Sequence, residues 1–344
     1  MRDSENTLEF NNAEPMASCI ERMQFFYELF PYPNRPFFLK PKPSGSIEAH
    51  AGFAQLISHG RIDPANLDDV KLRDVRHAFS DQKRIALVGC GTDEPLLFRA
   101  LHPHNPIVAI DLSHKSLLRA ERKIRWHNFK PVTLIHGDAQ TALAHSPKFD
   151  HIQCFGVLHH QPNPKHFFEV LAESLESSGT LRVMIYSSSG RRLERGIQRK
   201  FSSCWQSIQN CDELKGFRQF FKSIQLNWIA IQLLVWRVVL PFVSNRSKSM
   251  RFKYVKPSRA RLADAFLHPS DHALHLKDLL KWADEFGLKV ISYKAKSYEL
   301  GQINSLSTSK ISLQTLVDEE ERGNISTNIV LVFKKVVSPQ WNCN

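Results

Sequence analysis

The sequence predicts a doubly wound α/β fold, in which helices cover both faces of a mostly parallel sheet. Short apolar runs alternate with segments of helical periodicity between residues 84 and 186. The first apolar run ends at a turn formed by Gly89-Cys90-Gly91, and the second ends at Asp111. A strand, a glycine turn, a helix and a second strand ending in an acid together indicate a βαβ unit with a parallel strand pair.

The same alternation assigns each element of the core. The expected strands are 84–88, 106–110, 132–136, 150–155, 180–186, 288–295 and 328–336. The expected helices are 94–101, 113–127, 164–176 and 274–286. Ser113 can accept a hydrogen bond from the free N–H groups that begin the second of these helices. Residues 299–325 are polar and predict a loop with one short helix.

An N-terminal helical extension precedes this core. Apolar residues recur at helical spacing from Met16 to Phe30, and the prolines of segment 31–36 end that helix. Residues 47–80 predict short helices, whereas residues 1–14 predict no structure. The Pro31–Pro36 leader has two interpretations: a rigid turn, or a flap over a ligand in which Tyr32 stacks and Arg35 pairs with an acid.

The net charge of +12 comes from one segment. Residues 191–261 hold 16 Lys+Arg and 3 Asp+Glu, so the rest of the 344-residue chain is about neutral. We interpret this segment as a basic helical insert. Its apolar stretch 228–243 contains Arg237 and is shorter than the ~20 residues of a membrane span.

The basic insert has three interpretations. It forms a solvated helical face, it covers a lipophilic or acidic substrate, or it makes peripheral contact with an anionic membrane surface. Nucleic acid is disfavoured because no RNA-binding module is recognisable. Six cysteines without a Cys-x-x-Cys pair indicate reduced thiols, and the polar start is unlike a signal peptide. The expected location is therefore the cytoplasm, with peripheral membrane contact as an option.

The glycine turn and Asp111 indicate a nucleoside site. Glycine permits a tight turn and a close approach of a ligand to the backbone, and an acid at the tip of the second strand can accept hydrogen bonds from ribose hydroxyls. A dinucleotide fingerprint needs a third glycine, where this chain has Glu94. Because Asp93 and Glu94 would repel a diphosphate, the turn suits a positively charged ligand such as S-adenosylmethionine. A nicotinamide-dependent oxidoreductase is disfavoured for the same reasons.

Taken together, these motifs resemble those of class I S-adenosylmethionine-dependent methyltransferases. The motifs that carry the resemblance are Val88–Thr92, Ala109–Ser113, His136–Ala139, Phe149–His160 and Leu175–Leu181, with the Phe30–Arg35 leader and the Phe266–Pro269 block of a narrower branch. The resemblance implies a Rossmann-like sheet of seven strands in the family's usual order, with the last strand antiparallel. It also implies S-adenosylmethionine as the cofactor.

The resemblance assigns nine residues to the cofactor: Gly89, Cys90, Gly91, Asp111, Leu112, Asp138, Ala139, Phe155 and Gly156. The turn residues would pass close to the methionine part, and Asp111 would hold the ribose. Asp138 and Ala139 would contact the adenine, and Phe155 and Gly156 would line the floor beside the sulfonium.

Two positions depart from the family pattern. The acid that commonly stands two residues before the first glycine is Leu87 here, and Asp93-Glu94 replace the third glycine. One of these two acids is a candidate replacement partner for the methionine ammonium group.

His159 and His160 are the candidate catalytic residues. They follow the fourth predicted strand, where a general base could reach a methyl acceptor. The alternative is structural, with the pair capping the strand and orienting the next loop.

A second cluster contains His268, Asp271, His272 and His275. Zinc binding is one interpretation. We favour a turn in which Asp271 and its neighbours cap helix 274–286, with substrate contact by His268 as a second option, and we assign no metal.

The sequence predicts methyl transfer by in-line displacement to a small-molecule or lipid-like acceptor of lipophilic or acidic character. The alternative is an inactive, methyltransferase-like binding or scaffold protein. Four regions are expected: an N-terminal extension and leader (1–80), a cofactor-binding core (81–190), a basic helical insert or lid (191–262) and a C-terminal part that completes the sheet (263–344). The oligomeric state is not predicted.

Overall fold

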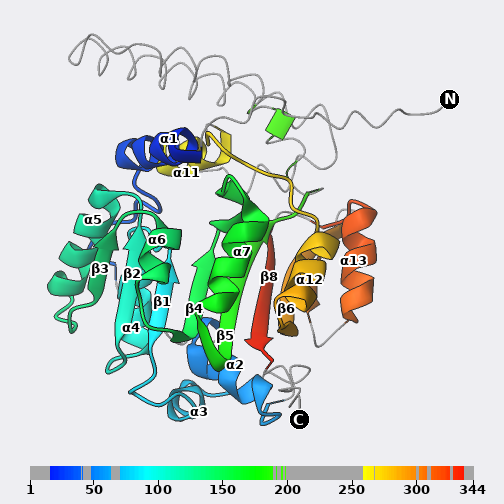
Figure 1. Ribbon diagram of the computed structural model, residues 1–344, viewed down its shortest axis with the longest axis horizontal. Helices are drawn as coiled ribbons and strands as arrows, with labels where there is room; N and C mark the ends of the chain where they lie inside the picture. Colours follow the sequence, from blue (N-terminus) through cyan, green and yellow to red (C-terminus); the bar gives the residue numbers. More distant parts are fainter. Residues whose placement is uncertain are drawn as a thin grey trace, which may run out of the picture.

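One mixed sheet forms the centre of the molecule (Figure 1). The computed structural model describes residues 16–39, 41, 48–62, 70–188, 191, 195, 196, 198, 259–266, 268–299, 302–307, 311–325 and 328–336. The strands of this part of the chain are β1 (Ile85–Val88), β2 (Ile107–Asp111), β3 (Thr133–His136), β4 (Phe149–Phe155), β5 (Leu175–Tyr186), β6 (Leu288–Glu299), β7 (Gln302–Ser307) and β8 (Asn328–Lys335). Their order in the sheet is β3-β2-β1-β4-β5-β8-β6-β7.

The strand order confirms the predicted fold and adds one strand. Strands β1 to β5 are parallel, and β8 runs antiparallel to both β5 and β6. The extra strand, β7, pairs antiparallel with β6 at the end of the sheet, where the polar sequence predicted a loop. Residues 302–307 lack a strong strand pattern of their own, so pairing with the long β6 determines their structure.

Helices cover both faces of the sheet. Those that pack along it are α4 (Glu94–Leu101), α5 (His114–Trp126), α6 (Ala139–Ala144), α7 (Pro164–Glu173), α12 (Leu276–Glu285) and α13 (Leu313–Glu321). Ser113 caps α5 as predicted, accepting a hydrogen bond from Ser116 N–H at 3.1 Å. The six-residue α6 was not predicted because it is too short to show a helical period.

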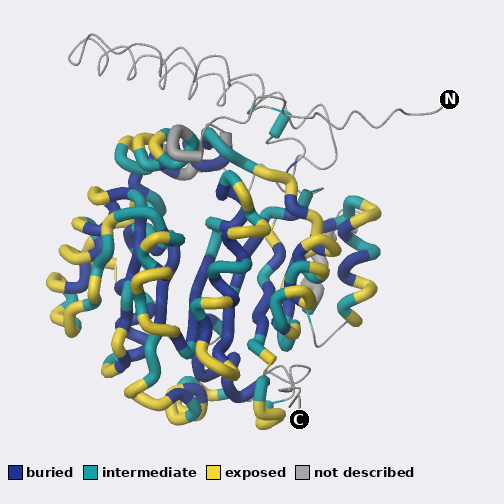
Figure 2. Tube along the Cα trace, viewed as in Figure 1, coloured by how far each residue is buried: buried dark blue, intermediate teal, exposed yellow. Residues whose placement is uncertain are grey.

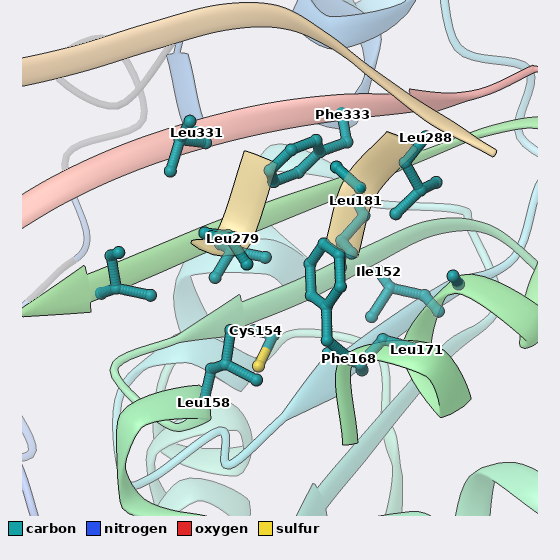
Figure 3. Packing of buried hydrophobic residues seen from close by; sticks show 14 of the residues in the cluster. Ile152, Cys154, Leu158, Phe168, Leu171, Leu181, Leu279, Leu288, Leu331 and Phe333 are labelled. Carbon is teal, nitrogen blue, oxygen red and sulfur yellow. The ribbon is translucent and has the colours of Figure 1, made fainter. Parts of the chain in front are cut away.

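Side chains of β1 alternate between two apolar layers. Ala86 and Val88 belong to the layer under α6, α7 and α12, whereas Ile85 and Leu87 face α4 and α5. In the first layer, side chains of α7, α12 and four strands interdigitate, and Phe168 packs against Phe333 with ring centroids 5.5 Å apart (Figure 3). Burial of both sheet faces explains why the central strands are continuous apolar runs (Figure 2).

Two helices lie across the end of the sheet where the parallel strands finish (Figure 1). They are α1 (Met16–Leu29) and α11 (Arg259–Phe266), while α2 (Ala51–Ser58) and α3 (Leu72–His77) lie at the opposite end. The predicted helix of the N-terminal extension is thus present as α1. Since ligands of open α/β sheets bind outside the carboxyl ends of the strands, α1 and α11 lie where they can help to enclose a site.

Most of the predicted basic insert, including the apolar stretch 228–243, lies outside the described residues. Within the described ranges, no helix has both the length and the apolar character needed to cross a membrane.

Candidate active site

A cavity of about 680 Å³ opens at the carboxyl ends of the parallel strands. The turn after β1, the end of β2, the start of α6 and the end of β4 form one side of it, and the leader, α1 and α11 contribute the other side. All nine residues predicted to contact a cofactor line this cavity: Gly89, Cys90, Gly91, Asp111, Leu112, Asp138, Ala139, Phe155 and Gly156. The fold therefore brings together four motifs that are separated by up to 67 residues.

The glycine turn is closely covered on two sides. Gly89 and Gly91 have φ angles of +61° and +56°, which favour glycine. Val157 packs against Gly89, and the leader crosses Gly91, where the Tyr32 carbonyl accepts a hydrogen bond from Thr92 N–H at 3.0 Å. Neither glycine position has room for a side chain.

Charge pairing fastens the leader to the same turn. Arg35 Nε lies 3.4 Å from an Asp93 carboxylate oxygen, as the flap interpretation required of an acid partner. The other Asp93 oxygen pairs with the ammonium group of Lys123, whose side chain is 5% exposed, and accepts a hydrogen bond from Thr92 Oγ1 at 3.0 Å. Asp93 is therefore fully engaged by groups of the protein.

Asp111 connects the turn to the end of β2. Its Oδ2 accepts a hydrogen bond from Gly91 N–H at 2.7 Å, and its Oδ1 accepts one from Ser113 N–H at 2.8 Å. Burial raises the pKa of Asp111 to about 6, although both backbone hydrogen bonds favour the ionised form. Each carboxylate oxygen retains a second lone pair for a ligand on the cavity side.

Asp138 caps α6 as well as lining the cavity. Its Oδ2 accepts hydrogen bonds from Thr141 N–H at 3.0 Å and Thr141 Oγ1 at 3.1 Å. Within the described part of the chain this cap leaves Oδ1 for a ligand. Phe155 and Gly156 follow β4, and Gly156 N–H donates to the Met184 carbonyl at 3.1 Å, which fixes the floor of the cavity.

Glu94 reaches across β1 to β4. Its Oε1 accepts a hydrogen bond from Gln153 Nε2 at 3.2 Å, and Gln153 Oε1 accepts one from Arg182 Nη1 at 3.3 Å. Glu94 Oε2 is buried and has no hydrogen-bond partner among the described residues. Burial raises the pKa of Glu94 to about 8, although Gln153 and Arg182 act in the opposite direction.

The two candidate catalytic histidines lie in different environments. His160 lines the cavity, and its Nδ1–H donates to the Ser270 carbonyl at 2.6 Å, so Nε2 carries the lone pair. His159 does not line the cavity; its ring packs on Tyr186 with centroids 4.0 Å apart, and its carbonyl accepts from His272 N–H. The geometry therefore favours the structural interpretation for His159 and keeps His160 as a site residue.

The sequence did not reveal a polar group on the α11 side of the cavity. Asp264, on α11, is 7% exposed and lines the cavity beside Tyr27 and Tyr186. Tyr186 O–H donates to Asp264 Oδ2 at 3.4 Å, and Tyr27 O–H also bonds to this carboxylate. His268 Nε2 lies 3.0 Å from Tyr27 Oη. Burial raises the pKa of Asp264 to about 6, while Arg191 lowers it.

The structure bears on two interpretations of the second histidine cluster. The predicted cap of α12 by Asp271 is wrong, because Glu320 accepts the Leu276 N–H at 2.6 Å while Asp271 pairs with Arg191 at 3.3 Å. Glu320 lies on α13, too far along the chain for a local pattern to reveal it. The described residues contain no group of three side chains able to hold a metal ion, so the zinc interpretation has no support there.

Comparisons with known proteins agree with this architecture. Residues 80–224 match the family model of a methyltransferase domain. An uncharacterized protein of Synechococcus sp. is 23% identical over 281 residues, covering 80% of this chain and 60% of that protein.

Two solved structures of PKMT2 from Rickettsia typhi, one in complex with AdoHcy, are similar with TM-scores of 0.50 and 0.52 at 13% identity. They align with 87% of this chain, which spans only 55% and 54% of those chains. These likenesses show the fold. The motifs and the comparisons thus agree: residues 80–224 are similar to a methyltransferase domain, and the α/β fold is that of the two PKMT2 structures.

Proposed function

We propose that this protein transfers a methyl group from S-adenosylmethionine to an acceptor that binds on the side of the cavity lined by α1 and α11. The observation that carries the proposal is the convergence of nine predicted cofactor residues on one cavity within a methyltransferase domain. The AdoHcy complex of the structurally similar Rickettsia protein supports the choice of cofactor.

The described residues suit a ligand with a ribose and a positive charge. The Asp111 carboxylate stands beside the glycine turn and lines the cavity. The acids of the cavity wall are Asp93, Glu94, Asp111, Asp138 and Asp264, and the described cations are Arg35 and Lys123, both next to Asp93. This charge balance favours a cationic cofactor and disfavours the acidic acceptor that the basic insert suggested.

When bound, S-adenosylmethionine supplies a methyl group on a sulfonium, which is a good leaving group, so positioning provides much of the acceleration. Phe155 and Gly156 form a fixed floor for the reacting part. Tyr27 and Tyr186 also line the cavity, next to Asp264. An acceptor with an N–H or O–H nucleophile must also lose a proton, for which the nearby Asp264 carboxylate is suited.

Calorimetry with AdoHcy tests the cofactor proposal through Asp111. Replacement of Asp111 by alanine is expected to weaken AdoHcy binding by ~1–3 kcal/mol through lost ribose hydrogen bonds. The variant also leaves the Gly91 and Ser113 N–H groups without their carboxylate acceptor. Urea unfolding must therefore accompany the titration.

Asp111→Asn is the matched control, because its amide oxygen can still accept one of these hydrogen bonds. We expect it to fall between the wild type and Asp111→Ala in AdoHcy affinity. Equal affinity of all three proteins would remove Asp111 from the site.

The pKa values separate two candidate proton acceptors. Burial lowers the pKa of His160 to about 3, whereas that of Asp264 is about 6. An effective general base has a pKa near the working pH. We therefore expect Asp264 to accept the proton and His160 to orient the acceptor through Nε2.

Replacement of Asp264 by asparagine is expected to lower methyl transfer about 100-fold, the low end of general-base contributions. The assay follows the tritiated methyl of S-adenosylmethionine into a metabolite and lipid extract. Wild-type transfer should rise with pH through about pH 6, since the carboxyl group must be ionised to accept a proton.

Unchanged AdoHcy affinity in Asp264→Asn is the control that the cavity is intact. His160→Gln should retain more activity than Asp264→Asn, and the reverse order would return the base role to His160. A wild type that binds AdoHcy but labels no product in any extract would favour the scaffold alternative.

A further inference from the structure

The turn after β1 holds two acids, and the structure distinguishes their roles. Asp93 is engaged by Lys123, Arg35 and Thr92. Glu94 bonds through one oxygen only, while its buried Oε2 has no partner among the described residues. A buried carboxylate oxygen without a hydrogen-bond partner lowers the free energy of unfolding. A ligand that donates a hydrogen bond would remove this penalty, so Glu94 is the better candidate of the two acids for binding a ligand.

The position of Glu94 also compensates for the missing acid. Leu87 of β1 is paired with Gln153 of β4, and Gln153 is paired with Arg182 of β5, so these three side chains project from the same face of the sheet. Glu94 lies at the start of α4, on that face, and its carboxylate reaches Gln153. The Glu94 carboxylate, on α4, therefore lies near the position that the side chain of an acid at residue 87 of β1 would occupy.

We infer that Glu94 is the carboxylate that binds the ammonium group of the cofactor's methionine part, in place of an acid at position 87. The inference rests on the proposed use of S-adenosylmethionine and adds a residue to its site. Gln153, which itself accepts a hydrogen bond from Arg182, holds Glu94 Oε1, and Oε2 is the oxygen left for the ammonium group. Lys123 holds Asp93 in a structural role at the same turn.

The inference implies proton release on binding. The titratable and charged groups around Glu94 are Arg182, Asp111 and Asp93, and burial outweighs their combined effect on its pKa, which is about 8. Most of Glu94 is thus protonated at neutral pH in the free protein. A ligand ammonium favours the ionised form, so the proton leaves Glu94 and affinity rises with pH from about 6.5 to about 8.

Isothermal titration calorimetry with two ligands tests both the assignment of Glu94 and the expected proton release. The first is AdoHcy, and the second is its deaminated analogue, which keeps the carboxylate and lacks only the amino group. Titrations in buffers of different ionisation enthalpy report the protons released. Glu94→Gln is expected to weaken AdoHcy at least tenfold, to leave the analogue within about twofold, and to remove the proton release seen for AdoHcy with the wild type.

Asp93→Asn is the matched control, because it removes the neighbouring acid from the same turn. We expect it to affect both ligands equally. An equal loss for both ligands in Glu94→Gln, or an AdoHcy-selective loss in Asp93→Asn, would overturn the assignment. Failure of both ligands to bind the wild type would instead contradict the proposed function.

Discussion

Acidification from about pH 7.5 to about pH 5.5 is expected to lower the free energy of unfolding by several kcal/mol. Burial lowers the pKa of the six buried histidines of the described residues below the usual value of about 6.5: His50, His102, His151, His159, His160 and His268. Below about pH 6.5 the unfolded chain binds protons that these native side chains cannot bind, so stability falls as the pH falls.

Three carboxyl groups act in the opposite direction. The pKa of Glu94 is raised to about 8 and those of Asp111 and Asp264 to about 6, so their protonation stabilises the native state as the pH falls. The six histidines affect the pH dependence more than the three acids do, so unfolding takes up a net of about three protons near pH 5.5. Each proton changes the free energy of unfolding by ~1.4 kcal/mol per pH unit.

Urea unfolding at a series of pH values measures this slope. His151→Gln should reduce it by about one proton, because burial lowers the pKa of His151 to about 3. His145→Gln, at the exposed residue that follows α6, controls for the loss of a histidine as such. A stability that does not fall between about pH 7.5 and 5.5 would contradict the expected excess of proton uptake by the unfolded chain.

Replacement of Gly91 by alanine is expected to be the most damaging single change at the turn. The added Cβ would lie 2.3 Å from the Tyr32 carbonyl oxygen, a backbone atom that cannot move without displacing the leader. A non-glycine residue at φ +56° adds about 1–2 kcal/mol. We expect a total loss of ~2–5 kcal/mol of stability, since overpacking contributes a further ~1–3 kcal/mol.

Gly60 offers a matched control for the backbone contribution. Its φ is +67°, and a Cβ there would meet nothing within 4 Å. Gly60→Ala should therefore show only the conformational cost and leave AdoHcy affinity unchanged, whereas Gly91→Ala should also weaken AdoHcy because Tyr32 and Pro33 line the cavity. Equal destabilisation by the two substitutions would show that the leader moves away from a Cβ at position 91 without a measurable loss of stability.

The sequence was sufficient where local pattern determines structure. The apolar runs that end at Gly89 and Asp111 become strands buried on both faces, and Ser113 caps its helix through a neighbouring N–H. The nine residues predicted to contact a cofactor line one cavity because each lies at a strand end or in the turn that follows, and parallel strands bring these ends together.

Features that depend on contacts between residues far apart in the chain could not be predicted from the sequence. The choice between Asp93 and Glu94 depends on Lys123 and Gln153, which lie 30 and 59 positions away from their respective partners. Asp264 was missed because its place beside Tyr27 and Tyr186 arises only when α11 packs at the cavity. The cap by Glu320 and the pairing of β7 have the same origin.

The hydrogen bonds of the glycine turn also bear on which adenosine-containing compounds the cavity can bind. Cys90 N–H donates to the Ile110 carbonyl, Gly91 N–H to Asp111, and Thr92 N–H to the leader. In phosphate-binding turns, such N–H groups point at the anion. Here three consecutive amides are already satisfied by the protein, and acids stand beside them. ATP and NAD also contain adenosine, but their phosphates would find no free N–H group at this turn and would face acidic side chains. We therefore expect the site to bind ATP and NAD weakly, although no separate side chain among the described residues blocks them.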